Sequence, residues 1–298
     1  MLSILIPTYN YSVAPLVQEL QKQAISANIV FEIIVVDDAS SDEKIEEENK
    51  QINTISNCTY SIQKSNLGRT ETRQNLALKA SYSMLLFLDA DVSPKHSNFI
   101  GRFNLKVLDW DIQFGGITYK KEEPYSNEIL RWKYGMARES LSVSERKKDP
   151  YQTINSGAFL IKKELFLRVN SKLKFKKYGL DNLFKQLLQK EGAKVLHIDN
   201  AVYHLGLENS MLFIQKSKEA VKTTVELERQ GLIDDNRRPL QKSYLKLKKL
   251  GLLGIFSAVI RKCEERILKN LQSGKPSLFL FDLYRLQYYS ELKSKKDA

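Results

Sequence analysis

The sequence has few cysteines and no long apolar segment. Its two cysteines, Cys58 and Cys263, lie far apart and near no metal-spaced histidine, which excludes a disulfide framework and a zinc knuckle. No apolar run approaches the roughly 18 residues of a membrane-spanning helix. The N-terminal stretch MLSILIPTYN has no basic region or cleavage site, so we interpret it as a first strand instead of a signal peptide. These absences predict a cytoplasmic protein.

The usual glycine-rich phosphate loops are also absent. No G-x-G-x-x-G follows the first predicted strand, and G-x-x-x-x-G-K followed by Ser or Thr does not occur. The ordinary dinucleotide-binding and P-loop folds therefore lack their phosphate cradles. What is present is a chain of 298 residues with 42% hydrophobic content, which is enough for one large folded domain with an appendage.

The net charge of +12 is concentrated near the C-terminus. Residues 241–298 hold 13 Lys and Arg against five Asp and Glu. We therefore predict two parts, a main domain over residues 1–230 and a basic, amphipathic, helical extension over residues 231–298. The pI near 9.4 suggests a nucleic-acid-binding protein as an alternative, but the sequence has no basic face with interleaved aromatics and no recognisable nucleic-acid module.

Short β-rich runs alternate with helical patterns through the first half of the chain. This alternation predicts an α/β fold, a Rossmann-like and mostly parallel sheet flanked by helices. The strands are expected at residues 2–7, 31–38, 59–63, 84–91 and 112–119, and the helices at 14–24, 69–80 and 98–108.

Three of the predicted strands end in segments with polar residues. Pro7, Thr8, Tyr9 and Asn10 lie at the end of the first strand, Asp38 at the end of the second, and Asp89 and Asp91 at the end of the strand at 84–91. Ligands of open α/β sheets bind outside the carboxyl ends of the strands, so these residues are expected at one ligand-binding rim. Any one of these motifs alone is more often a turn or a helix cap.

The two carboxylates of the D-x-D sequence offer hard oxygen ligands for Mg²⁺ or Mn²⁺. Such an ion typically joins one or two carboxylates to the phosphates of a substrate. Arg69 and Arg73, near a helix start, can face anionic oxygen, although a solvated helix face is an equally good interpretation. Together these residues suggest a nucleoside diphosphate ligand.

The segments IPTYN, VVDDAS, NLGRTETRQN and LLFLDAD, in this order and spacing, resemble family 2 inverting glycosyltransferases with the GT-A fold. Later segments extend the resemblance to about residue 230. It implies a nucleotide-sugar donor, most often a UDP-sugar, and a glycan acceptor. The implied donor-binding residues are Pro7, Thr8, Tyr9, Asn10, Asp38, Arg69, Arg73 and Asp89.

The resemblance also implies a divalent metal ligated directly by Asp91, and it places a metal- or diphosphate-contacting histidine at His204. A lone histidine is more often structural, and His197 is interpreted in that way. The expected catalytic base is Asp181, although relatives often carry a Glu-Asp pair where this chain has Asp181 and Asn182. Two alternatives remain: Asp181 caps a helix beginning near residue 183, or the chain binds sugar nucleotides without catalysis.

The tail contains KSYLKLKKLGLLGIFSAVIRKCEERILKNL and then SLFLFDLYRLQYY. Each segment is too short in apolar residues to span a bilayer but suits the surface of an anionic membrane. The alternative is that these helices pack on the catalytic domain or on a second subunit, so oligomers stay open. Attachment at the inner face of the cell membrane would bring a cytoplasmic enzyme to a lipid-linked glycan acceptor in bacterial cell-surface polysaccharide synthesis.

Overall fold

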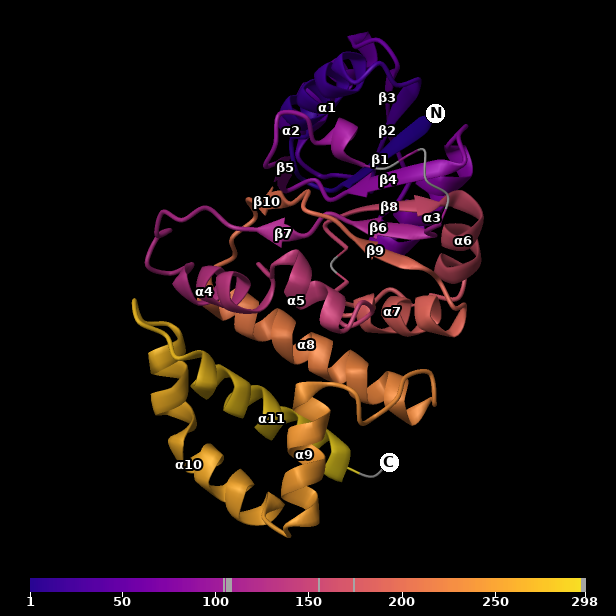
Figure 1. Cartoon of the computed structure of the whole chain (residues 1–298). Helices are drawn as coiled ribbons and strands as arrows, with labels where there is room; N and C mark the ends of the chain where they lie inside the picture. The colour runs from indigo at the N-terminus through magenta and orange to yellow at the C-terminus, as the bar shows by residue number, and fades with distance from the viewer. Residues whose placement is uncertain (104, 106–108, 155, 174, 296–298) are drawn as a thin grey trace. The chain divides into compact units, whose positions relative to one another are not determined.

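A computed structural model describes the whole chain except residues 104, 106–108, 155, 174 and 296–298 (Figure 1). The described chain divides into two compact units. The first unit comprises Met1–Tyr119, Arg138–Lys176 and Phe184–Gly206, and the second comprises Lys120–Ala137, Lys177–Leu183 and Leu207–Ala298. This division does not test the predicted domain boundary after residue 230, which stays a prediction.

The first unit is built on a sheet of seven strands in the order β3-β2-β1-β4-β8-β6-β9. Strands β1, β2, β3 and β4 run parallel, and β8 lies antiparallel between β4 and β6. The strands are β1 (Leu2–Thr8), β2 (Phe31–Asp37), β3 (Cys58–Ile62), β4 (Met84–Leu88), β6 (Ile112–Phe114), β8 (Ala158–Lys162) and β9 (Val195–His197). The predicted mostly parallel α/β fold is confirmed.

A second, smaller sheet lies in the same unit. It has the strand order β5-β10-β7, with β5 at Val92–Pro94, β10 at Val202–His204 and β7 at Ile117–Thr118. Strand β10 pairs antiparallel with β5 and parallel with β7. This small sheet therefore joins the segment directly after Asp91 to a segment more than 100 residues later in the chain.

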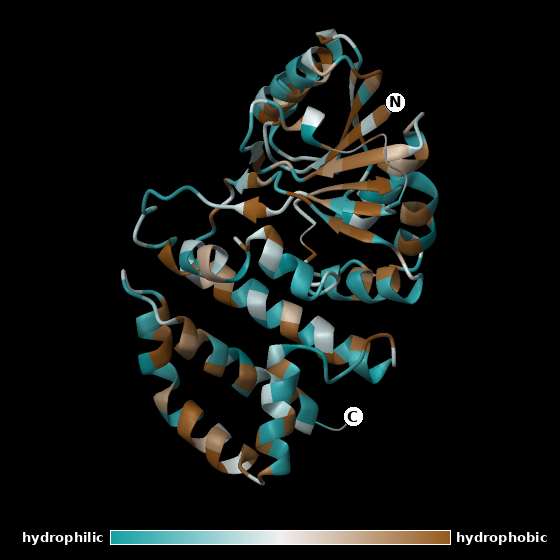
Figure 2. Ribbon diagram, viewed as in Figure 1, coloured by the Kyte–Doolittle hydropathy of each residue, from teal (hydrophilic) through white to brown (hydrophobic). Residues whose placement is uncertain are grey.

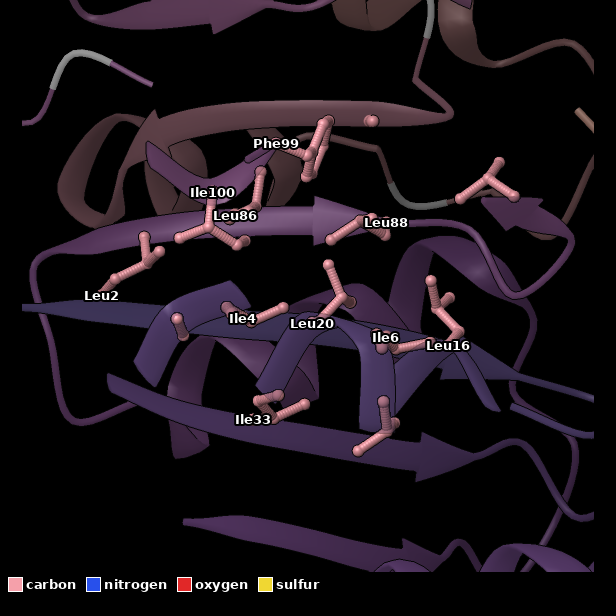
Figure 3. Close-up of a cluster of buried hydrophobic side chains, with 14 of the residues drawn as sticks. Leu2, Ile4, Ile6, Leu16, Leu20, Ile33, Leu86, Leu88, Phe99 and Ile100 are labelled. Atoms are coloured by element: carbon pink, nitrogen blue, oxygen red, sulfur yellow. The ribbon is translucent and has the colours of Figure 1, made fainter. Parts of the chain in front are cut away.

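The central strands are apolar along much of their length, as Figure 2 shows by their brown colour. Continuous apolar runs are typical of parallel strands that helices cover on both sides. Helix α1 (Ala14–Ser26) places Leu16 and Leu20 against Ile4 and Ile6 of β1 in the buried cluster drawn in Figure 3. Helix α3 (Arg69–Lys79) packs against β1, β2 and helix α6 (Lys163–Asn170). The packing of these helices on the sheet thus holds the ends of the strands in place, and the polar residues described below lie at those ends.

The remaining short elements of this unit are helical. They are α2 (Glu43–Lys50), α5 (Val143–Lys148) and the 3₁₀ turns at Gln51–Thr54 and Ile100–Arg102. The helix predicted at 98–108 is wrong in its described part, which is only the second of these turns. Phe103 has extended backbone angles, with φ −73° and ψ 133°, and ends the turn. Residues 104 and 106–108 lie outside the described residues.

The single strand predicted at 112–119 is also wrong, because it divides into β6 and β7 in different sheets. Gly116 has a φ of +96°, which disfavours residues other than glycine. A Cβ atom at Gly115 would lie 2.0 Å from the carbonyl oxygen of Asn200. The two glycines therefore allow a bend and a close backbone approach that a regular strand does not have.

The second unit is helical. It contains α4 (Ile129–Arg138), α8 (Ser210–Arg229), α9 (Pro239–Lys249), α10 (Leu253–Leu271) and α11 (Leu278–Ser294), while α7 (Asp181–Lys190) begins in it and ends in the first unit. The side chain of Glu228 is buried there and accepts hydrogen bonds from Tyr289 at 2.8 Å and Gln241 at 2.6 Å.

Among the described residues, no helix is long and apolar enough to cross a membrane.

Helix α11 contains the second tail segment for which a membrane surface was considered. Phe281, Tyr284, Leu286 and Tyr289 are all buried against other helices of the second unit. These four side chains pack within the protein, and membrane contact of the segment stays a prediction.

Candidate functional site

Strands β1, β2 and β4 end at the same edge of the large sheet. Thr8 and Asp37 are register partners, and the Asp38 N–H donates to the Thr8 carbonyl at 2.8 Å. Leu5 lies opposite Phe87 in β4, so Asp89 follows β4 at this edge as well. The predicted convergence of three polar strand ends is confirmed.

The loop after β1 is joined to the loop after β2 by Asn10. Asn10 has a φ of +48°, a conformation that Asn tolerates better than most residues. Its backbone N–H donates to Ser40 Oγ at 2.7 Å, and its Oδ1 accepts from the Ser41 N–H at 2.8 Å. Tyr9 beside it is 51% exposed, so its ring is accessible to a ligand.

Pro7 and Thr8 belong to β1 itself. Pro7 lies opposite Val36 and is half-buried. Thr8 is buried and donates its hydroxyl to the Tyr11 carbonyl at 2.8 Å. Both residues therefore shape the loop that presents Tyr9 and Asn10.

Asp38 is buried and holds the loop that precedes α3. Its carboxylate accepts from the backbone N–H groups of Leu67 at 2.7 Å and Gly68 at 2.8 Å, and from Gln63 Nε2 at 2.8 Å. Gly68, with a φ of +88°, immediately precedes α3 and its first residue, Arg69. Asp38 thus positions the start of the helix that carries both arginines.

We expect Asp38→Asn to destabilise the protein by about 1–3 kcal/mol, because the new amide NH₂ faces backbone N–H donors that lose an acceptor. Chemical denaturation measures this free energy of unfolding. The matched control is Asp42→Asn, because Asp42 caps α2 and Asn caps helices equally well. Equal stability of the two variants would show that the Asp38 contacts do not hold the loop.

Asp89 is bound by both arginines of α3. Arg69 Nη2 lies 2.7 Å from Asp89 Oδ2, and Arg73 Nη2 lies 2.7 Å from Asp89 Oδ1. Arg69 also donates to Ser156 Oγ at 2.8 Å and Arg73 to the Ser156 carbonyl at 2.7 Å. Arg73 is buried beside the ring of Phe159. Asp89 therefore orients two guanidinium groups at the rim, and these cations suit an anionic ligand.

Asp91 lies beside His204. Their closest side-chain atoms, Asp91 Oδ2 and His204 Nε2, are 3.5 Å apart, and both side chains are partly exposed. The pairing of β5 with β10 sets this distance, because His204 is opposite Val92. The Leu205 N–H donates to the Asp91 carbonyl at 2.8 Å, and a Cβ at Gly206 would lie 2.2 Å from Asp91 Oδ2.

The negative charge of Asp91 affects the hydroxyl group of Tyr11. Burial, and next the charge of Asp91, raise the pKa of the Tyr11 hydroxyl. The Tyr119 ring lies 5.6 Å from the His204 ring, centroid to centroid. Asp91 and His204 therefore form a partly enclosed pair that aromatic side chains border.

The donors of this pair suit a divalent cation. A carboxylate oxygen and an imidazole nitrogen are ligands that Mn²⁺ accepts, and Mg²⁺ sites commonly use one or two carboxylates with phosphate oxygens. Within the part of the chain that the structure describes, no group of three His, Cys, Asp or Glu side chains could hold a metal. The pair could thus hold a metal whose other positions are filled by substrate and water.

Asp181 lies in the second unit, where it is the first residue of α7 and is exposed. The helix thus begins two residues earlier than predicted. Asn182 donates its side-chain amide to the Gly179 carbonyl at 3.3 Å. A carboxylate at the start of a helix is stabilised by the helix dipole, so a structural role for Asp181 stays compatible with this position.

The sequence alone did not indicate two further residues of this site. Ser156 contacts both arginines, and Gly206 allows the chain to pass close to Asp91. Ser156 lies two residues before β8, and a lone serine does not indicate contact with arginines more than 80 residues earlier in the chain. Gly206 follows His204 in the sequence, but its need for a small residue comes from a strand pairing that local pattern does not reveal.

The sequence model of glycosyl transferase family 2 matches residues 3–165, which is more than half of the chain. The chain belongs to glycosyl transferase family 2. The donor residues predicted from Pro7 to Asp89, and Asp91, lie within the matched range, whereas His204 and Gly206 lie beyond it. No curated protein sequence matches this member of the family significantly.

Two solved structures show the fold that this glycosyl transferase family 2 member adopts. A mannosyltransferase from Pyrobaculum calidifontis in complex with GDP-Man and Mn²⁺ has a TM-score of 0.56 and 16% identity, over 97% of this chain and 86% of that chain. Mannosyl-3-phosphoglycerate synthase from Rubrobacter xylanophilus has a TM-score of 0.53 and 15% identity, over 80% and 77%. At these identities the likeness shows the shared GT-A fold.

Proposed function

We propose that this glycosyltransferase is a metal-dependent, inverting enzyme that moves a hexose from a UDP-sugar to a glycan acceptor. The main observation in support is the arrangement at the end of β4, where Asp91 lies beside His204 and Asp89 holds Arg69 and Arg73. A carboxylate-imidazole pair next to two guanidinium groups suits a metal-bound diphosphate. The likeness to a mannosyltransferase in complex with GDP-Man and Mn²⁺ is consistent with this chemistry.

In this proposal the loops after β1 and β2 bind the nucleoside. The exposed ring of Tyr9 contacts the base, and the loop that Asn10 holds places polar groups around the ribose. Arg69 and Arg73 lie by the diphosphate. The full proposed donor set is Pro7, Thr8, Tyr9, Asn10, Asp38, Arg69, Arg73 and Asp89.

Asp91 and His204 are the residues that would hold Mn²⁺ or Mg²⁺. When bound, such an ion neutralises negative charge on the leaving diphosphate. Asp91 is the direct carboxylate ligand, because Asp89 is already bound by two arginines.

We assign Asp181 the role of general base. In an inverting transfer the acceptor hydroxyl attacks the anomeric carbon on the side opposite the leaving group, and a positioned carboxylate accepts its proton. Asn182, an amide, cannot accept a proton in this way. The assignment is supported by the resemblance and by the exposure of the Asp181 carboxylate.

The proposed acceptor is a glycan of cell-surface polysaccharide synthesis, carried on a lipid at the cytoplasmic face of the membrane. Asn182, in place of an acid found in relatives, favours a second candidate function, that of a sugar-nucleotide-binding protein without turnover. Both candidates require donor binding, and only the first requires sugar transfer.

A panel of nucleotide sugars with Mn²⁺ tests the donor class by thermal unfolding. We expect UDP-hexoses at about 100 times their dissociation constant to raise the unfolding midpoint by about 5 °C, because a ligand that binds only the folded state stabilises it. A chelator should remove the shift. Stabilisation by GDP-hexoses alone would change the assigned nucleotide, and no shift with any nucleotide sugar would contradict the proposed function.

A further inference from the structure

Helices α9 and α10 meet at a tight turn around Gly251, which has a φ of +70°. Apolar side chains at this turn and on the first half of α10 are exposed to solvent, and Figure 2 shows α10 largely brown there. They are Leu250 (58% exposed), Leu252 (41%), Ile255 (66%) and Val259 (54%). Residues 252, 255 and 259 share one helical face, since they are three and four positions apart.

Basic residues border these apolar side chains on both sides. Lys246, Lys248 and Lys249 precede the turn, and Lys262, Arg266 and Lys269 continue the same face of α10. All six are exposed, and within the described chain none of them forms an ion pair with a carboxylate. We call these four apolar and six basic residues the α9–α10 surface. Glu264 and Glu265 are the acidic residues of α10, so the six basic residues still give the surface a net positive charge.

Helix α10 packs into the core of the second unit through its opposite face. Ile260, Ile267 and Leu271 are buried in a cluster with Phe281 of α11. The apolar residues of the α9–α10 surface therefore lie outside the packing of the second unit. Four clustered, exposed apolar side chains with a basic border are the pattern of a docking surface.

We propose that the α9–α10 surface docks on a bilayer of anionic phospholipids. Leucine, isoleucine and valine side chains can enter the boundary between headgroups and acyl chains, while lysine and arginine contact the anionic headgroups. The proposal goes beyond the transfer reaction, and its test requires no activity.

The charge and the apolar centre of the α9–α10 surface favour an anionic bilayer over a second copy of the chain or a nucleic acid. A second copy of the chain joined through a two-fold axis would bring six basic residues against the same six, which is unfavourable. A nucleic acid would match the basic border but would offer the four central apolar side chains no apolar partner. An anionic bilayer complements both the border and the centre.

Flotation of the full chain with vesicles tests the proposal. We expect binding to phosphatidylcholine vesicles that contain about 30% phosphatidylglycerol, weaker binding as salt increases, and little binding to pure phosphatidylcholine. No binding to the anionic vesicles at low salt would overturn the proposal.

Two variants with matched controls locate the contact. Ile255→Ser combined with Val259→Ser should lower binding about tenfold or more, whereas Phe279→Ser, at an exposed apolar position of α11, should not. Lys248→Glu combined with Lys249→Glu should have a similar effect. Its control is Lys22→Glu combined with Lys44→Glu, which changes the net charge equally on exposed residues of the first unit.

Circular dichroism and thermal unfolding check that each variant is folded. Equal flotation of the surface variants and their controls would overturn the proposal. So would light scattering that shows a dimer of the native chain and a monomer of the Ile255→Ser/Val259→Ser variant, because the occupant would then be a second copy.

Discussion

Asp91→Asn is expected to weaken Mn²⁺-dependent binding of UDP by about a hundredfold or more, since even outer contacts of a metal site contribute tenfold to a hundredfold. The amide is neutral and a poor ligand, and His204 remains as the single protein donor of the pair. Isothermal titration of UDP in the presence of Mn²⁺ measures the effect. Binding of UDP without metal should change little, because Asp91 acts on the diphosphate through the ion.

The control for lost charge is Asp199→Asn, because Asp199 is an exposed carboxylate of the same unit. It should keep native affinity and native dependence on Mn²⁺. If Asp91→Asn also kept both, the metal site proposed at Asp91 and His204 would be wrong.

Asp181→Asn is expected to lower sugar transfer by about 10²–10⁴-fold while UDP affinity stays within about twofold of native. The base accepts a proton only as the acceptor attacks, so its removal affects the transition state and leaves donor binding almost unchanged. Steady-state transfer to a defined acceptor gives the rate, and titration of UDP with Mn²⁺ gives the affinity.

Asn182→Asp is the matched variant at the neighbouring position. It restores the second acid that relatives carry, so turnover should be retained or increased. Near-native turnover of Asp181→Asn would contradict the assignment of the base. Donor binding without turnover in the native chain and in Asn182→Asp would favour the non-catalytic candidate.

Several strands of the first half could be predicted closely because they are runs of apolar and other β-forming residues separated by helical patterns. The strand predicted at 84–91 is wrong at its end, because β4 ends at Leu88. The predicted strands at 2–7, 31–38 and 59–63 each agree with the structure to within one residue at either end. The prediction of one strand at 112–119 was wrong because the sequence does not show that the chain bends at Gly115 and Gly116. The close approach to Asn200 that requires Gly115 comes from a segment more than 80 residues away.

The site residues could be placed at strand ends, but their contacts could not be predicted. Local pattern does not show that Asp89 binds Arg69 and Arg73, or that Asp38 accepts from backbone N–H groups before α3. These contacts depend on how α3 packs on the sheet. Composition also could not separate α10 from α11, because both are rich in apolar residues. Only the packing shows that Ile255 and Val259 of α10 are exposed while Tyr289 of α11 is buried.

Anomalous diffraction at the manganese edge, from crystals grown with UDP and Mn²⁺, tests the central claim most directly. The account predicts one manganese peak within coordination distance of the Asp91 carboxylate and His204 Nε2, with the diphosphate on the metal and near Arg73. A nucleotide bound away from the ends of β1, β2 and β4, or a manganese ion with neither Asp91 nor His204 among its ligands, would contradict it.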